Sequence, residues 1–241
     1  MTSSIADNGT SVFDPCLCEL MYLWFTKGGD AVLDPFAGGS VRGIVAELMG
    51  RAYTGVELRP EQVDANREQA ARLCARQPTW IVGDSMQINE IASGDYDFIL
   101  TCPPYADLEV YSDDPADLSN MPYDEFAQAL RLILGKSVGM LRPDRFAAIV
   151  IGDVRDEAGF LRGLPALVVS AMEDGGARYY NEAVLATQCG SAPIRARAQF
   201  EKSRKLVKTH QDVLVFCTGD PVLATERLGK VSFADYEALW L

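Results

Sequence analysis

The chain has 241 residues, 48% of them hydrophobic, and a formal net charge of -12 at pH 7. This composition is ordinary for a globular protein with one substantial core, and the negative charge argues against binding of nucleic acid by a uniformly basic surface. We expect one domain over residues 1–241, in the cytoplasm or nucleoid. No apolar run has the length of a membrane span, and residues 1–10 lack a secretory pattern.

Residues that could bind a metal or act as a catalytic base are few. The chain has one histidine, His210, which excludes a multi-histidine metal centre and disfavours a Ser/His/Asp triad. The cysteines show no paired Cys-x-x-Cys spacing of a zinc or disulfide scaffold; they stand at positions 16, 18, 74, 102, 189 and 217. We therefore predict reduced thiols and no metal site.

Apolar runs of strand length alternate with helical stretches along most of the chain. We predict strands at 31–33, 51–56, 80–82, 97–100 and 146–152, and helices at 40–49, 60–75 and 123–141. This alternation indicates an α/β fold with a mainly parallel sheet covered on both faces. A predicted helix at 161–172 is followed by strand-like runs at 179–187 and 212–217, which we interpret as a terminal hairpin joined by a long loop.

The first predicted strand leads into a glycine-rich turn, Asp34-Pro35-Phe36-Ala37-Gly38-Gly39-Ser40, with another glycine at Gly43. Small residues let the backbone bend sharply and approach a ligand, and the helix that follows offers unpaired N–H groups. The turn lacks the lysine of a nucleotide triphosphate loop, and Asp34 would repel a phosphate. A ligand that carries an amine or sulfonium fits this turn better.

Acidic residues stand at the ends of the next two predicted strands. Glu57 follows the glycine turn by about twenty residues, where a carboxylate can accept hydrogen bonds from both ribose hydroxyls. Asp84, followed by Ser85, could accept from an adenine amino group. One such acid is more often a helix cap than a ligand contact, but the register of Asp34, Glu57 and Asp84 together favours a nucleoside-containing ligand.

The most informative segment is Thr101-Cys102-Pro103-Pro104-Tyr105, directly after the apolar run 96–100. Prolines donate no ladder hydrogen bond, so the strand must end where this rigid turn begins. Active sites of open α/β sheets gather at such strand ends.

The glycine turn followed by the double-proline turn resembles the amino-methylating DNA methyltransferases, which modify the exocyclic amine of cytosine or adenine. The resemblance implies a Rossmann-like class I methyltransferase fold with a seven-stranded, doubly wound sheet. In this chain we expect no separate large target-recognition domain. It also implies S-adenosylmethionine as the cofactor. The cofactor-binding positions that it assigns are Phe13, Asp14, Pro15, Asp34, Pro35, Phe36, Ala37, Gly38, Glu57, Asp84 and Ser85.

In this family the double-proline turn holds the target base, which is flipped out of the duplex. The resemblance gives catalytic roles to Cys102, Pro103, Pro104 and Tyr105: the Cys102 side chain and the Pro103 carbonyl accept the amino hydrogens, and Tyr105 stacks on the base. Family members commonly carry Asp, Asn or Ser where this chain has Cys102. Ser-Pro-Pro-Tyr is typical of cytosine N4 methylation, so we favour cytosine N4 over adenine N6.

Other functions stay open on the sequence alone. The Cys102 thiolate could attack C6 of cytosine and direct methylation to C5, or the thiol could be a small buried filler. An acidic stretch over residues 107–117 would repel phosphate, so RNA, a free nucleotide or a protein could be the acceptor instead of DNA. The chain could also be a non-catalytic partner subunit that binds S-adenosylmethionine.

A basic segment interrupts the acidic composition between residues 191 and 210. A solvated loop is the ordinary interpretation of such a run, and a stripe that contacts the phosphates of duplex DNA is the alternative. The nucleic-acid-binding candidates are Arg195, Arg197, Lys202, Arg204, Lys205 and Lys208, against a single Glu201. A homodimer is one arrangement that would let a methyltransferase of this size enclose a duplex.

Overall fold

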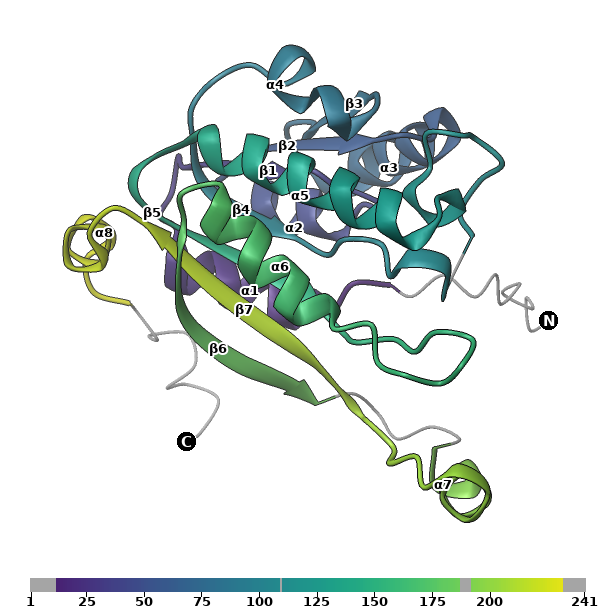
Figure 1. Cartoon of the computed structure of the whole chain (residues 1–241). Coiled ribbons are helices and arrows are strands. Elements are labelled where there is room, and N and C mark those ends of the chain that lie inside the picture. The colour runs from purple at the N-terminus through teal and green to yellow at the C-terminus, as the bar shows by residue number, and fades with distance from the viewer. Residues whose placement is uncertain (1–11, 109, 187–191, 232–241) are drawn as a thin grey trace, which may run out of the picture.

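A seven-stranded sheet runs through the molecule in the order β3-β2-β1-β4-β5-β7-β6 (Figure 1). The computed structural model describes residues 12–108, 110–186 and 192–231. Neighbours are parallel from β3 through to β5, and β7 is antiparallel to both β5 and β6. The strands are β1 (Ala31–Asp34), β2 (Ala52–Glu57), β3 (Thr79–Val82), β4 (Tyr96–Thr101), β5 (Leu141–Ile151), β6 (Arg178–Ala186) and β7 (His210–Thr218). The predicted fold class is confirmed.

Helices cover both faces of this sheet. They are α1 (Pro15–Phe25), α2 (Val41–Leu48), α3 (Pro60–Leu73), α4 (Ile88–Ile91), α5 (Tyr123–Gly139), α6 (Leu164–Asp174), α7 (Ala192–Ser203) and α8 (Pro221–Leu228). Alternate residues of the central strands divide between two cores, because successive strand side chains point to opposite faces. Val32 and Phe98 pack with α1, α2 and α3, whereas Leu33 and Ile99 pack with α5 and α6. None of the helices in the described ranges is long and apolar enough to cross a membrane.

The helix α2 lies close to the sheet because Gly43 has no side chain. A Cβ at Gly43 would lie 2.6 Å from Cζ2 of Trp80 and 3.0 Å from the ring of Tyr53. Any larger residue would push the first turn of α2 away from β2 and β3. The glycine therefore sets the position of the turn that precedes the helix.

Four helices were not among the sequence predictions: α1, α4, α7 and α8. Asp14 and Asp220 cap α1 and α8, and Pro15 and Pro221 begin them, a combination that favours helix starts. The connection between β6 and β7 was predicted to be a loop, but it contains α7. Within α7 an ion pair of 2.8 Å between Arg197 and Glu201, one turn apart, stabilises the helix. The end of the predicted strand at Thr187, Cys189, Ser191, Glu109 and residues 232–241 lie outside the described residues.

Candidate active site

The glycine turn and the double-proline turn lie side by side, at the carboxyl ends of β1 and β4. The strands that lead into them, β1 and β4, are parallel neighbours with Leu33 opposite Ile99. At the ends of these two strands, the Oγ1 of Thr101 donates a hydrogen bond of 2.6 Å to Oδ1 of Asp34, and both side chains are fully buried. The two most informative motifs of the sequence are therefore joined directly through buried side chains.

Asp34 is enclosed by protein donors. Its Oδ2 accepts hydrogen bonds from Nε of Arg42 at 2.6 Å and from the hydroxyl of Tyr53 at 2.7 Å. Burial first, and then the Asp34 carboxylate, raise the pKa of Tyr53 well above its ordinary value, so the phenol remains a donor. In this arrangement the carboxylate holds the turn in place through buried hydrogen bonds, and its predicted role in binding the cofactor stays a prediction.

Arg42 is a structural member of the site that we did not predict. Its Nη2 donates to the carbonyl oxygens of Phe36 at 2.7 Å and Ala37 at 3.0 Å, and its guanidinium lies 4.6 Å from the centroid of the Phe13 ring. Burial alone would lower the pKa of Arg42, but the Asp34 carboxylate raises it above the ordinary value. Arg42 therefore connects the Phe13 ring with the backbone of the glycine turn.

Glu57 lies directly against the glycine turn. The N–H of Gly38 donates to Oε2 of Glu57 at 2.9 Å, and φ of Gly38 is +50°, a conformation that favours glycine. On the other side, Nδ2 of Asn66 in α3 donates to the Gly38 carbonyl at 2.7 Å. The Glu57 side chain keeps 12% of its surface exposed, which leaves it accessible at the end of β2.

The end of β3 is connected to the same turn. The hydroxyl of Ser85 donates to the carbonyl of Pro35 at 2.5 Å. Oδ1 of Asp84 accepts from the N–H of Met86 at 2.8 Å and so caps a short 3-10 helix, Ser85–Gln87. The ends of β1, β2 and β3 are thus connected by hydrogen bonds around the glycine turn, and the partly buried carboxylates of Glu57 and Asp84 lie beside it. These donors and acceptors fit a ligand with ribose hydroxyls and an adenine amine.

Tyr105 is held in place by two residues that sequence reasoning missed. Nε2 of Gln211 in β7 donates to its hydroxyl. A Cβ at Gly152 would lie 3.2 Å from Cε1 of the Tyr105 ring, so the ring packs closely where β5 ends. The Sγ of Cys102 lies 3.7 Å from the Tyr105 hydroxyl. Burial, and then the neighbouring Cys102, raise the pKa of Tyr105 well above its ordinary value, so the side chain is a neutral phenol.

The basic segment leads into the sheet beside this turn. Lys208 stands three positions before Gln211, the residue that holds Tyr105. Some of the predicted basic residues have partners: Arg197 pairs with Glu201, Lys208 pairs with Asp212 at 3.0 Å, and Arg204 lies over the ring of Phe200. The remaining candidates, Arg195, Lys202 and Lys205, complete a basic surface around α7 and the segment that follows it.

Comparison with known sequences identifies the first part of this site. Residues 13–68 match the DNA methylase family of N6/N4 type. This range includes Phe13, the glycine turn and Glu57. We call residues 13–68, which are similar to this family, the DNA methylase segment. Within the family, the type II methyltransferase M.Cfr9I of Citrobacter freundii is 46% identical over 55 residues, and M2.DpnII of Streptococcus pneumoniae is 38% identical over 53 residues. These alignments cover 23% and 22% of this chain and 17% and 20% of the two relatives.

The methylase segment lies within a methyltransferase fold. TrmN from Thermus thermophilus superposes with a TM-score of 0.61 over 88% of this chain and 51% of its own, at 16% identity. The predicted fold is confirmed, the predicted family is confirmed over residues 13–68, and this family implies S-adenosylmethionine as the cofactor. The family match ends at residue 68, so the roles of Asp84, Ser85, the double-proline turn and the basic residues stay predictions.

Proposed function

We propose that this protein transfers a methyl group from S-adenosylmethionine to the exocyclic amine of a flipped base in duplex DNA, with cytosine N4 favoured over adenine N6. The observation that carries the proposal is the 2.6 Å hydrogen bond between Thr101 and Asp34. It places the turn of the DNA methylase segment beside the double-proline turn. Donor and acceptor sites of a methyl transfer must adjoin in this way, because the reacting atoms have to be held in line at short range.

The cofactor side of the reaction belongs to the surface formed by the ends of β1, β2 and β3. S-adenosylmethionine supplies a sulfonium-bound methyl group that leaves readily. In our proposal Glu57 accepts from the ribose hydroxyls, Asp84 and Ser85 lie at the adenine, and the Phe36–Gly38 backbone lies against the methionyl part. Arg42 and Asn66 hold that backbone in place from behind through bonds to Phe36, Ala37 and Gly38.

The acceptor side belongs to the double-proline turn. An exocyclic amine is a poor nucleophile because its lone pair is delocalised into the ring. Two acceptors that hold both amino hydrogens draw the nitrogen toward tetrahedral geometry, and we assign them to the Cys102 side chain and the Pro103 carbonyl. Tyr105, fixed by Gln211, would stack on the base, and Pro104 keeps the turn rigid. Catalysis then depends on position and electrostatics.

The preference for cytosine depends on the resemblance of this turn to Ser-Pro-Pro-Tyr. The two turns differ by a thiol in place of a hydroxyl at Cys102. A sulfur atom is a weaker acceptor than oxygen, so we expect the same target with a slower rate. Adenine N6 is the alternative target of the same site.

Mass spectrometry of nucleosides tests this proposal. DNA from cells that express the wild type should contain N4-methylcytosine. The Tyr105→Ala variant should reduce it by about tenfold or more, because stacking of a base on an aromatic ring contributes ~1–3 kcal/mol. Tyr105→Phe keeps the ring and should retain most of the product. N6-methyladenine would move the target to adenine, and DNA without any added methyl group would contradict the proposal.

A further inference from the structure

A short hairpin over residues 153–163 follows β5 and is held rigid by its own hydrogen bonds. Its two sides pair through a bridge between Arg155 and Leu161. At its base, Oδ1 of Asp153 accepts from the backbone N–H groups of Gly163 at 2.9 Å and Leu164 at 3.1 Å. Near its tip, Nη1 of Arg155 donates to the carbonyl of Gly159 at 2.8 Å. These hydrogen bonds connect the two sides of the hairpin both at its base and near its tip.

This rigid tip presents a large apolar side chain to solvent. Phe160 is 72% exposed and its neighbour Leu161 is 55% exposed. Phe160 is the most exposed phenylalanine among the described residues. Full burial of such a ring contributes ~1.5–3 kcal/mol, so its exposure on a braced loop indicates a surface that meets a partner.

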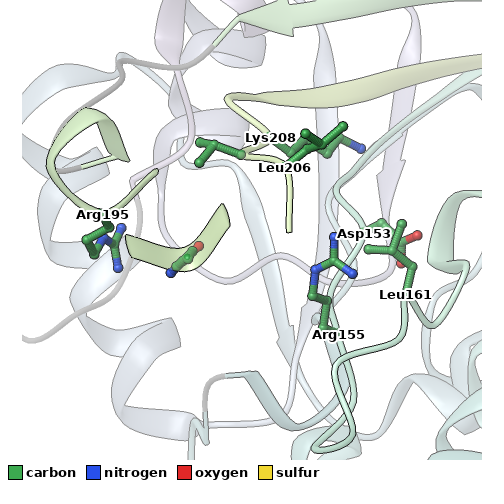
Figure 2. A pocket seen from close by; sticks show the side chains of 8 residues that line it. Asp153, Arg155, Leu161, Arg195, Leu206 and Lys208 are labelled. Carbon is green, nitrogen blue, oxygen red and sulfur yellow. The ribbon is translucent and has the colours of Figure 1, made fainter. Parts of the chain in front are cut away.

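Cationic side chains stand beside this apolar tip. The hairpin and the segment around α7 form the two walls of a cleft: Asp153, Arg155 and Leu161 line one wall, and Arg195, Leu206 and Lys208 are on the other (Figure 2). The two walls also touch at the tip, where a Cβ at Gly159 would lie 2.6 Å from Nζ of Lys205. The exposed phenylalanine thus stands beside a concentration of positive charge in a chain whose net charge is -12.

The hairpin also stands next to the double-proline turn. It begins directly after Gly152, against which the Tyr105 ring packs. Its far side is joined to the start of α5, because the hydroxyl of Tyr123 donates to the Arg162 carbonyl at 3.0 Å. The base of the hairpin therefore lies beside the Tyr105 ring.

We propose that Phe160 is an apolar wedge that enters the duplex beside the target base, while Arg155, Arg195 and Lys205 contact the phosphates on either side. Apolar side chains that insert between base steps open the stack, and an extruded base leaves a gap that such a side chain can fill. The inference rests on the proposed function, since it assigns the opening of the duplex to the same site. It adds a role that only a paired substrate requires.

Methyl transfer to paired and unpaired DNA separates this role from others. The substrates are linearised unmethylated plasmid and the same plasmid after heat denaturation, labelled with tritiated S-adenosylmethionine. Phe160→Ala should reduce labelling of the duplex by about tenfold or more, because separating stacked base pairs costs a few kcal/mol. Labelling of the denatured strand should stay within about twofold, since no duplex has to be opened there. Phe160→Trp keeps a large aromatic side chain and should label the duplex about as well as the wild type.

The matched control is Leu73→Ala, which removes another exposed apolar side chain, at the end of α3. It should label both substrates as the wild type does, and calorimetry should show that both variants bind S-adenosylmethionine equally. Equal duplex labelling by Phe160→Ala and wild type would overturn the wedge, and so would an equal loss on both substrates. If the wild type itself labels neither DNA, the proposed function fails and the wedge fails with it.

Discussion

The thiol of Cys102 decides which of two chemistries the double-proline turn performs. As a hydrogen-bond acceptor it is replaceable, whereas as a nucleophile it is not. We predict that Cys102→Ser keeps or increases the rate of methyl transfer, because a hydroxyl oxygen accepts the amino hydrogen better than sulfur. Cys102→Ala should lower the rate by about tenfold, the value of one lost hydrogen bond of ~1.4 kcal/mol. Single-turnover labelling of DNA measures both.

A duplex that contains 5-fluorocytosine provides the opposing outcome. Attack by a thiolate on C6 would trap a covalent adduct that survives denaturation. Loss of activity in Cys102→Ser together with such an adduct would replace amino methylation by ring-carbon methylation. If Cys102→Ser is as active as the wild type and no adduct forms, Cys102 acts as a hydrogen-bond acceptor.

Single residues also mark the limit of what the sequence could predict. Asp34, Glu57 and Asp84 were found because they stand at strand ends, a position that the alternation of apolar and polar runs reveals. Arg42 was missed because its sequence position is an ordinary helical one. Its importance comes from burial, which only tertiary packing defines: the side chain turns inward to Asp34 and to the carbonyls of Phe36 and Ala37. Gln211 was missed for the same reason, since it meets Tyr105 from 106 residues away.

At the scale of elements, the strands of the sheet could be predicted from the sequence, whereas several of the helices around it could not. The parallel strands are rich in apolar residues, and β4 is buried along its whole length. Helix α7 was predicted as a loop because its residues are mostly polar or charged and carry no apolar stripe. In the structure its one aromatic residue, Phe200, is 44% exposed. Its helical form depends on local propensity and the Arg197–Glu201 pair, signals that are weaker than a buried face.

Asp97 lies near the start of the central strand β4, and its effect on stability should depend on pH. Its carboxylate accepts from the N–H of Ala31 at 3.1 Å, from Arg142 at 2.6 Å and from Arg145 at 2.9 Å, and so connects β4 with β1 and β5. Burial alone would raise the pKa of Asp97, but these donors lower it well below its ordinary value of 3.8. A lowered folded pKa adds stability above the ordinary value, and this stability is lost as the pH falls toward the folded value.

We therefore predict that Asp97→Asn lowers the free energy of unfolding by roughly 2 kcal/mol at pH 7, less than for a fully buried pair because Arg142 is 41% exposed. Urea unfolding between pH 7 and pH 3 should show the difference from wild type narrowing below about pH 4. Asp95→Asn removes an exposed carboxylate nearby and should change neither quantity. A difference that stays constant across this range would mean that Asp97 acts through packing instead of charge.

At the scale of the whole molecule, charge is separated rather than balanced. The net charge of -12 repels DNA at long range. Cationic side chains nevertheless stand together on α7, on the segment after it and on the hairpin 153–163, which begins beside Tyr105. Total charge could be counted from the sequence, and the basic run was visible in it. Its meeting with the hairpin could not be predicted, because Arg155 and Lys205 are fifty positions apart and converge only in the folded chain.

This separation predicts how binding of a duplex responds to salt. Replacement of Arg195, Lys202 and Lys205 by Gln should weaken binding at low salt and reduce the slope of log K against log salt by about 2 to 3, because each phosphate contact that is lost releases about one counterion fewer. Fluorescence anisotropy of a labelled duplex measures this slope. The matched control removes three exposed cations from α3 and the residues after it, Arg67, Arg72 and Arg76, without touching this surface. If both triple variants change the slope equally, the net charge of the molecule governs binding and α7 carries no interface; if only the first does, the interface lies where the basic residues meet the hairpin.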